Sequence, residues 1–210
     1  ARLALAVPGT DVVVGDYERV DTQGLLTSER ALAHDPWMAL IRTRMGTTSS
    51  NLWSRSALER AGGWDVDLAS SQDYELMFRL LKQGASVLPD PVVRTRVYKR
   101  SSGSISKTDV AGNWQRYIAL RRAIMEHLRA TEPTGRASEI EMCRQYIFMA
   151  LRIVAKQDQA GATREYQRSI GAGFSPMVGA ATSAPYVFLH QLFGFGTAER
   201  LLRAYHRIRS

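Results

Sequence analysis

The spacing of hydrophobic residues changes once along this chain, near residue 110, and that change limits the folds open to it. Before this point short apolar runs alternate with turn residues, and Val12-Val13-Val14 is an uninterrupted β-branched run that suits a strand buried on both faces. Beyond it, apolar residues recur at helical spacing, over residues 114–129, 138–156, 162–170 and 186–207. We therefore predict an α/β region over residues 1–110 and an all-α region over 111–210.

The composition is that of an ordinary globular protein. With 210 residues, 45% of them apolar and 23% charged, the chain can form one domain, or a smaller domain with a helical appendage. Its longest apolar stretch, Pro185–Gly196, is shorter than the roughly 18–20 residues that span a bilayer. The residues at the start do not resemble a signal peptide, and the single Cys143 cannot form an internal disulfide. We therefore expect a cytoplasmic protein, and expect Cys143 to pack in a core.

The net charge of +8 is concentrated in one stretch. Residues 91–130 contain nine Lys and Arg residues and two acidic residues, so this stretch alone carries seven excess positive charges. Such a field attracts diphosphates, nucleic acids or anionic membranes. One hypothesis is therefore a basic, non-catalytic binding or scaffold module, although the stretch has few of the interleaved aromatic residues typical of single-strand binders.

The clearest helix signal lies between Ser70 and Gly84. Ser70 or Ser71 suits its N-cap, and Gly84 follows its last apolar residues as a C-cap. Asp73 falls in the first turn, where a carboxylate at the lip of a pocket can accept a proton from a hydroxyl group. Ser70 and Asp73 also have the spacing of a capping box, which taken alone is the commoner role for such an Asp.

Two further local features are predicted around this helix. Ser56 is placed to cap a short helix that Gly62-Gly63 would end. Pro89-Asp90-Pro91 is expected to separate two short strands, residues 85–88 and 92–97. A polar loop follows from Lys99 to Thr108.

Five motifs follow one another along the first half of the chain. They are Val12–Asp16 with Gly24, Ser49–Arg55, the Gly-Gly-Trp-Asp corner within Ala61–Asp65, Ser71–Leu80 and Tyr98–Ser106. In this order they resemble the second half of a family 2 glycosyltransferase domain, which is inverting and of the GT-A type. Each motif is modest evidence alone, and together they cover about half of the chain.

The resemblance implies a role for several residues. Asp73 would be the general base, and Trp64, Asp65 and Gln72 would contact the acceptor. The donor diphosphate would be bound by residues of the last motif, namely Lys99, Arg100, Ser104 and Ser106. The reaction implied is transfer of a sugar from a nucleotide-diphospho-sugar to an acceptor hydroxyl, with inversion, in the synthesis of a polysaccharide, lipopolysaccharide or other glycoconjugate. The acceptor would be a saccharide or lipid-linked molecule, and nucleic acid is not an expected partner.

The sequence departs from the family pattern in three ways. Gln72 stands where the family has Glu, and Ser101 stands where it has a loop histidine. The family's Asp-x-Asp motif, which holds Mg²⁺ or Mn²⁺, does not occur ahead of Asp11, and Asp65-Val66-Asp67 follows the Gly-Gly-Trp corner rather than a buried strand. We therefore expect this sequence to form the acceptor-side half of the domain, without the nucleotide-binding half and its metal site. Without that half, we expect this part to be inactive by itself.

The final helix combines aromatic residues with arginines. Its first part is rich in Phe and Leu, and Arg200, Arg203, Arg207 and Arg209 follow. We expect this helix to pack against protein, and contact with a membrane surface at the cytoplasmic face is the alternative.

Overall fold

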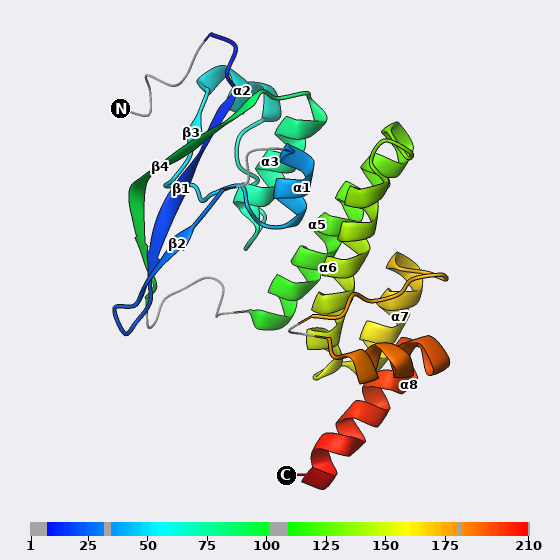
Figure 1. The fold of residues 1–210 in the computed structure, drawn as a ribbon. Coiled ribbons are helices and arrows are strands. Elements are labelled where there is room, and N and C mark those ends of the chain that lie inside the picture. Colours follow the sequence, from blue (N-terminus) through cyan, green and yellow to red (C-terminus); the bar gives the residue numbers. More distant parts are fainter. Residues whose placement is uncertain (1–7, 32–34, 101–108, 180–181, 210) are drawn as a thin grey trace. The chain divides into compact units, whose positions relative to one another are not determined.

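The computed structural model describes residues 8–31, 35–100, 109–179 and 182–209, and its main elements are shown in Figure 1. The chain forms two compact units, Ala1–Asn113 and Trp114–Ser210. The first is mixed α/β and the second is built from helices, as the change of pattern predicts. The two are described separately below.

Strand β1 (Val12–Val20) is the centre of the sheet. It pairs antiparallel with β2 (Leu26–Glu29) and β3 (Leu52–Trp53), and parallel with β4 (Val87–Tyr98). The three valines at its start are at most 2% exposed, which confirms the strand predicted to be buried on both faces. A turn joins β1 to β2, and the Asp21 carboxylate holds it by accepting hydrogen bonds from two backbone N–H groups, 2.8 and 2.9 Å away.

The Pro89-Asp90-Pro91 segment does not separate two strands, and that prediction is wrong. Strand β4 is continuous from Val87 to Tyr98, with its irregularity absorbed as a shift in register against β1. Asp90 is 1% exposed, and its carboxylate accepts hydrogen bonds from the Val92 N–H (3.1 Å) and the Arg94 Nε (3.1 Å). The missing N–H group of Pro91 is tolerated because it falls where the ladder is interrupted, whereas Pro89 is still in register with Val14.

Three short helices complete this unit: α1 (Pro36–Ile41), α2 (Arg55–Ala61) and α3 (Gln72–Lys82). They lie to one side of the sheet in Figure 1, and α3 contacts both α1 and α2. Their apolar faces form much of the unit's core, where the most deeply buried large side chains are Leu40, Ile41, Leu76, Met77 and Leu80.

Helix α2 begins two residues earlier than predicted. Its N-cap is Ser54, whose hydroxyl accepts from the Ala57 N–H at 3.3 Å, and not Ser56. Both serines suit a cap by residue type, so the choice depends on the strand that precedes them. The end at Gly62 is confirmed: its φ of 76° is left-handed, as expected of a glycine that ends a helix.

The second unit contains most of α5 (Val110–Thr131), together with α6 (Ala137–Ala155), α7 (Gln159–Ser169) and α8 (Ala184–Arg209). These helices fall close to the predicted ranges. Helix α8 is interrupted at Gly194 (φ 73°, ψ 172°), whereas Gly196 continues the helix, with space for a β-carbon limited by Thr163 at 3.2 Å.

Phe148 lies at the centre of this second unit. It is 1% exposed, and aromatic rings from three further segments surround it, with centroids between 5.2 and 6.5 Å away: Tyr166, Phe174, Tyr186, His190 and Phe195. Cys143 is fully buried in the same unit, as predicted, and burial raises the pKa of its thiol to about 12. In the part of the chain that the structure describes, no helix has the length and apolar character needed to cross a membrane.

Candidate functional site

The start of α3 positions Asp73. The N-cap is Ser71, whose backbone is left-handed (φ 66°) and whose side chain, within the described residues, makes no capping hydrogen bond. The capping box predicted from Ser70 and Asp73 is therefore wrong, because Asp73 is the second residue of the helix rather than the third. Its carboxylate instead accepts a hydrogen bond from the indole Nε1 of Trp64, 3.2 Å from Oδ1.

Trp64 connects this carboxylate to the sheet. Its half-buried ring meets the ring of Trp53 edge to face, with centroids 5.7 Å apart and planes at 69°. Trp53 belongs to β3 and is paired with Val12 of β1. A continuous series of contacts thus runs from the central strand to Asp73, and it limits the positions that the carboxylate can take.

Arg79 holds the glycine corner against α3. Its guanidinium donates to both carboxylate oxygens of Glu75 (2.7 Å from Nε to Oε1 and 2.7 Å from Nη2 to Oε2) and to the carbonyl oxygens of Ala61 and Gly63. The hydrogen bond with Glu75 is the main cause that raises the pKa of Arg79. Arg79 was not among the predicted site residues, although its four-residue spacing from Glu75 could have indicated the pair.

Gln72 and Asp65 stabilise the loop between the corner and the helix. The Gln72 side chain donates through Nε2 to the Leu68 carbonyl at 2.6 Å, and Asp65 Oδ1 accepts from the Asp67 N–H at 2.9 Å. Asp65 is exposed and Gln72 half-buried. The structure therefore places Trp64, Asp65, Gln72 and Asp73 in one short corner. Asp65 and Gln72 stabilise the loop of that corner through hydrogen bonds to its backbone.

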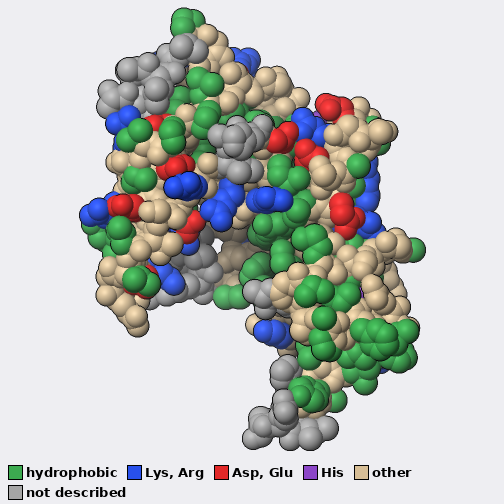
Figure 2. All heavy atoms as spheres, in the orientation of Figure 1, with side chains coloured by type: hydrophobic (Ala, Val, Ile, Leu, Met, Phe, Trp, Pro, Cys, Tyr) green, Lys and Arg blue, Asp and Glu red, His purple; other side chains and the backbone are tan. Residues whose placement is uncertain are grey.

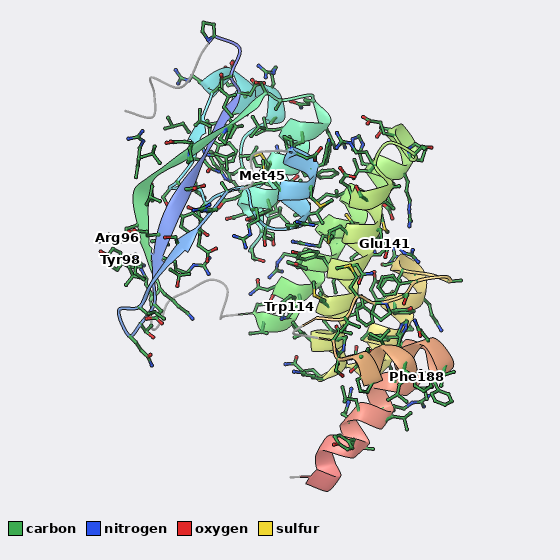
Figure 3. The ribbon with its side chains drawn as sticks, in the orientation of Figure 1. Met45, Arg96, Tyr98, Trp114, Glu141 and Phe188 are labelled. Atoms are coloured by element: carbon green, nitrogen blue, oxygen red, sulfur yellow. The ribbon has the colours of Figure 1, made fainter. Side chains whose placement is uncertain are left out.

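The residues predicted for the donor diphosphate begin where β4 ends. Lys99 donates its backbone N–H to the Val20 carbonyl at 2.8 Å, and the side chains of Lys99 and Arg100 are exposed. In Figure 3, Arg96 and Tyr98 mark this end of β4, at the edge away from the unit's helices. Ser104 and Ser106, like Ser101, lie outside the described residues.

Several arginines of the basic stretch 91–130 are engaged within the protein. Arg94 pairs with Asp90 (3.1 Å) and Arg96 with Glu18 (2.7 Å), while Arg122 pairs with Glu165 (2.9 Å). Arg121 is 2% exposed, with its guanidinium carbon 3.3 Å from the centre of the Tyr117 ring. These contacts leave less free positive charge than the residue count suggests, which counts against a nucleic-acid-binding surface here.

The described residues do not fit the divalent cation that the family resemblance implies. Among them, no group of three or more His, Cys, Asp or Glu side chains is arranged to hold a metal ion. The Asp65-Val66-Asp67 triplet forms the exposed turn described above, with Asp65 Oδ1 already accepting from the backbone. No catalytic step through a metal is therefore derived for these residues.

A separate pocket of about 520 Å³ lies in the helical unit, between α5, α6 and α7. Its floor is apolar, and its rim carries Arg122, Arg164, Arg168, Asp158 and Glu165. Arg122 and Arg168 both pair with Glu165, at 2.9 and 4.0 Å. We favour as the candidate site the Asp73 corner, which consists of Trp64, Asp65, Gln72 and Asp73. The Asp73 carboxylate is held there by the indole of Trp64, which itself packs on Trp53.

Comparisons of the chain with protein-family models, with curated proteins and with solved structures found no match. The likeness to family 2 glycosyltransferases therefore rests on the five sequence motifs, and the activity it implies is treated below as a proposal.

Proposed function

We propose that this protein is an inverting glycosyltransferase and that residues 1–110 form the acceptor-side part of its GT-A domain. The observation that carries the proposal is the placement of Asp73. Its Oδ1 is held by Trp64, and among the described residues no hydrogen bond occupies Oδ2. A half-buried carboxylate with one fixed and one available oxygen suits a general base.

The proposed reaction is a single in-line displacement. The acceptor hydroxyl gives its proton to Oδ2 of Asp73 as its oxygen forms a bond to the anomeric carbon of the donor sugar. The bond from that carbon to the diphosphate breaks at the same time, and the nucleoside diphosphate leaves with the electron pair. Inversion follows because attack and departure occur on opposite faces.

Other residues would bind the two substrates. Trp64 and Asp65 lie beside Asp73 and would contact a saccharide or lipid-linked acceptor, while Gln72 would hold the loop that carries them. Lys99 and Arg100 are exposed cations suited to diphosphate oxygens, and Ser104 and Ser106 are assigned to the same role by resemblance alone. The nucleotide-binding half and its Mg²⁺ or Mn²⁺ remain expectations of the same resemblance.

The test is Asp73→Asn, assayed for sugar transfer with a panel of nucleotide-diphospho-sugars in a form of the protein that includes the nucleotide-binding half. Asparagine keeps the size and can still accept from Trp64, but it cannot take up the proton. We expect transfer to fall by about 10²–10⁴-fold, the range typical of a general base.

Asp67→Asn is the matched control, because Asp67 is an exposed carboxylate in the same loop. It should retain transfer, and both variants should keep the wild-type circular dichroism spectrum. Full transfer by Asp73→Asn would remove the base assignment, and a wild-type protein that turns over no nucleotide-sugar would remove the proposed activity.

A further inference from the structure

The first part of α8 is apolar on two opposite sides. Tyr186, Val187 and His190 face the core and are at most 9% exposed. Phe188 and Leu192 are one turn apart on the other side and are 60% and 58% exposed. Phe193 adds a third large apolar side chain, 55% exposed. We call Phe188, Leu192 and Phe193 the α8 patch.

The α8 patch faces outward from its unit. Figure 3 shows the Phe188 side chain pointing away from the helices of that unit, and Figure 2 shows hydrophobic side chains gathered over the region of α8. A helix that is apolar all round is normally covered on every side, whereas a surface helix has one polar face. Phe188 and Leu192, with Phe193 exposed next to Leu192 in the chain, therefore indicate a surface that contacts something else.

The charges near the patch indicate what that contact is. Residues 170–210 contain four arginines and one acidic residue, Glu199. Glu199 is 6% exposed and pairs with Arg152 at 2.7 Å, so its charge is compensated inside the unit. The exposed Arg200 lies just beyond the kink at Gly194. Among the described residues, this segment thus presents the Arg200 cation and apolar side chains without an exposed carboxylate to oppose them.

The balance of charge disfavours a second copy as the occupant. Residues 114–210 contain 14 basic and 7 acidic residues, a net charge of +7, so two such units facing each other would repel. An anionic bilayer has the complementary charge, and its interface accepts aromatic and leucine side chains together with arginines.

We propose that α8 lies in the plane of an anionic lipid bilayer, with the α8 patch inserted at the boundary of headgroups and acyl chains and Arg200 directed at lipid phosphates. The contact is peripheral and reversible, because it buries only three side chains. It does not depend on the proposed transferase activity. Asp73→Asn should therefore bind vesicles like the wild type.

The experiment is sedimentation of the protein with phosphatidylcholine vesicles, with or without phosphatidylglycerol. We expect the wild type to bind the anionic vesicles at least about tenfold more tightly, because the arginines act only on a negative surface. The double variant Phe188→Ser with Leu192→Ser should lose about tenfold of that binding, because it removes most of the inserted apolar area. The control is Leu25→Ser with Leu26→Ser, two exposed leucines (66% and 47%) of the β1–β2 hairpin, which should bind normally.

Three results would overturn the proposal. One is equal binding to neutral and anionic vesicles, and another is unchanged binding by the folded double variant. The third is a wild-type dimer in solution that the double variant dissociates, without vesicle binding, which would assign the patch to a second copy. If the double variant does not fold, Phe188→Trp provides the test: its emission should shift to the blue on binding, and bound protein with no shift rejects insertion.

Discussion

The two units contain the same number of basic residues and use them differently. Each has 14 Lys and Arg residues, but residues 1–113 have 13 acidic residues and residues 114–210 have 7, giving net charges of +1 and +7. In the sheet unit, arginines fix neighbouring segments to each other, as Arg60 does with Asp11 and Arg79 with Glu75. Arginines also join segments of the helical unit, as Arg152 does with Glu199. The difference between the units is that the helical unit has seven more basic than acidic residues, so part of its positive charge has no acidic counterpart in that unit.

The hydrophobic cores of the two units also differ. The sheet unit buries aliphatic side chains from a strand and several short helices, whereas the helical unit gathers aromatic rings around Phe148. A core with one central ring depends on that ring, because five other rings lie with their centroids within 6.5 Å of it. Substitutions can therefore test whether the two units are stabilised independently.

Phe148→Ala is expected to have the largest effect on stability. Removing this fully buried ring leaves a cavity among aromatic neighbours that cannot close it, which typically costs about 3–5 kcal/mol. The loss should be confined to the helical unit. Three of the four tryptophans lie in the sheet unit, so denaturation followed by far-ultraviolet circular dichroism should shift to lower denaturant while the tryptophan fluorescence transition stays in place.

Leu76→Ala is the reciprocal variant. Leu76 is fully buried in the sheet unit, and its truncation should shift the fluorescence transition by an amount that corresponds to about 2–5 kcal/mol. If both signals move together in both variants, the two units unfold as one and the comparison above is wrong.

Arg79→Met tests whether a charged contact sets the geometry of the sheet unit. Methionine keeps the aliphatic stem but leaves Glu75 and two backbone carbonyls without their donor, so we expect a loss of about 2–3 kcal/mol. Transferase activity should also fall, since the glycine corner carries Trp64. The measurement is fluorescence-detected unfolding together with the transfer assay.

Arg55→Met is the control for that variant. Arg55 pairs with Glu59 four residues on in a helix, but the two side chains are 93% and 70% exposed, and such pairs contribute about 0.3–0.5 kcal/mol. Equal losses in the two variants would show that Arg79 is one more surface charge rather than a fixed clamp.

The sequence predicted what depends on local pattern. The buried strand at Val12–Val14, the helix at residues 72–82 and the helix end at Gly62 follow from periodicity and from glycine's access to positive φ. The helical unit was predicted for the same reason. Its boundaries were accurate because amphipathic spacing persists over several turns in each helix.

What the sequence did not predict depends on contacts between distant residues. The capping box at Ser70 failed because Asp73 bonds instead to Trp64, nine residues earlier, and the break at Pro89–Pro91 failed because β1 supports the irregular strand. Arg79 reaches carbonyls 16 and 18 residues away, which no short motif records. The role of the Asp73 corner is a prediction from motifs that the transfer assay has still to test.

The smallest effect is expected from pH, and it should again separate the units. His190 is buried against Tyr166, whose hydroxyl lies 3.0 Å from Nε2, and burial lowers the pKa of the imidazole below its ordinary 6.5. In the sheet unit, hydrogen bonds from the Ser86 N–H and Arg60 lower the pKa of Asp11 below its ordinary 3.8. In both cases the unfolded chain takes up a proton before the folded one does.

The sign of the effect is therefore the same in both units, but the pH window differs. The contribution of His190 is complete above pH 6.5 and is lost as the pH falls towards the folded pKa, whereas that of Asp11 persists down to about 3.8. Between pH 6.5 and pH 3.8, acidification should lower the denaturation midpoint followed by circular dichroism and leave the midpoint followed by tryptophan fluorescence nearly unchanged. His190→Gln should reduce that pH dependence at whatever stability it retains. If the denaturation midpoint followed by circular dichroism falls as much with pH in His190→Gln as in the wild type, other groups in the helical unit set its response to acid.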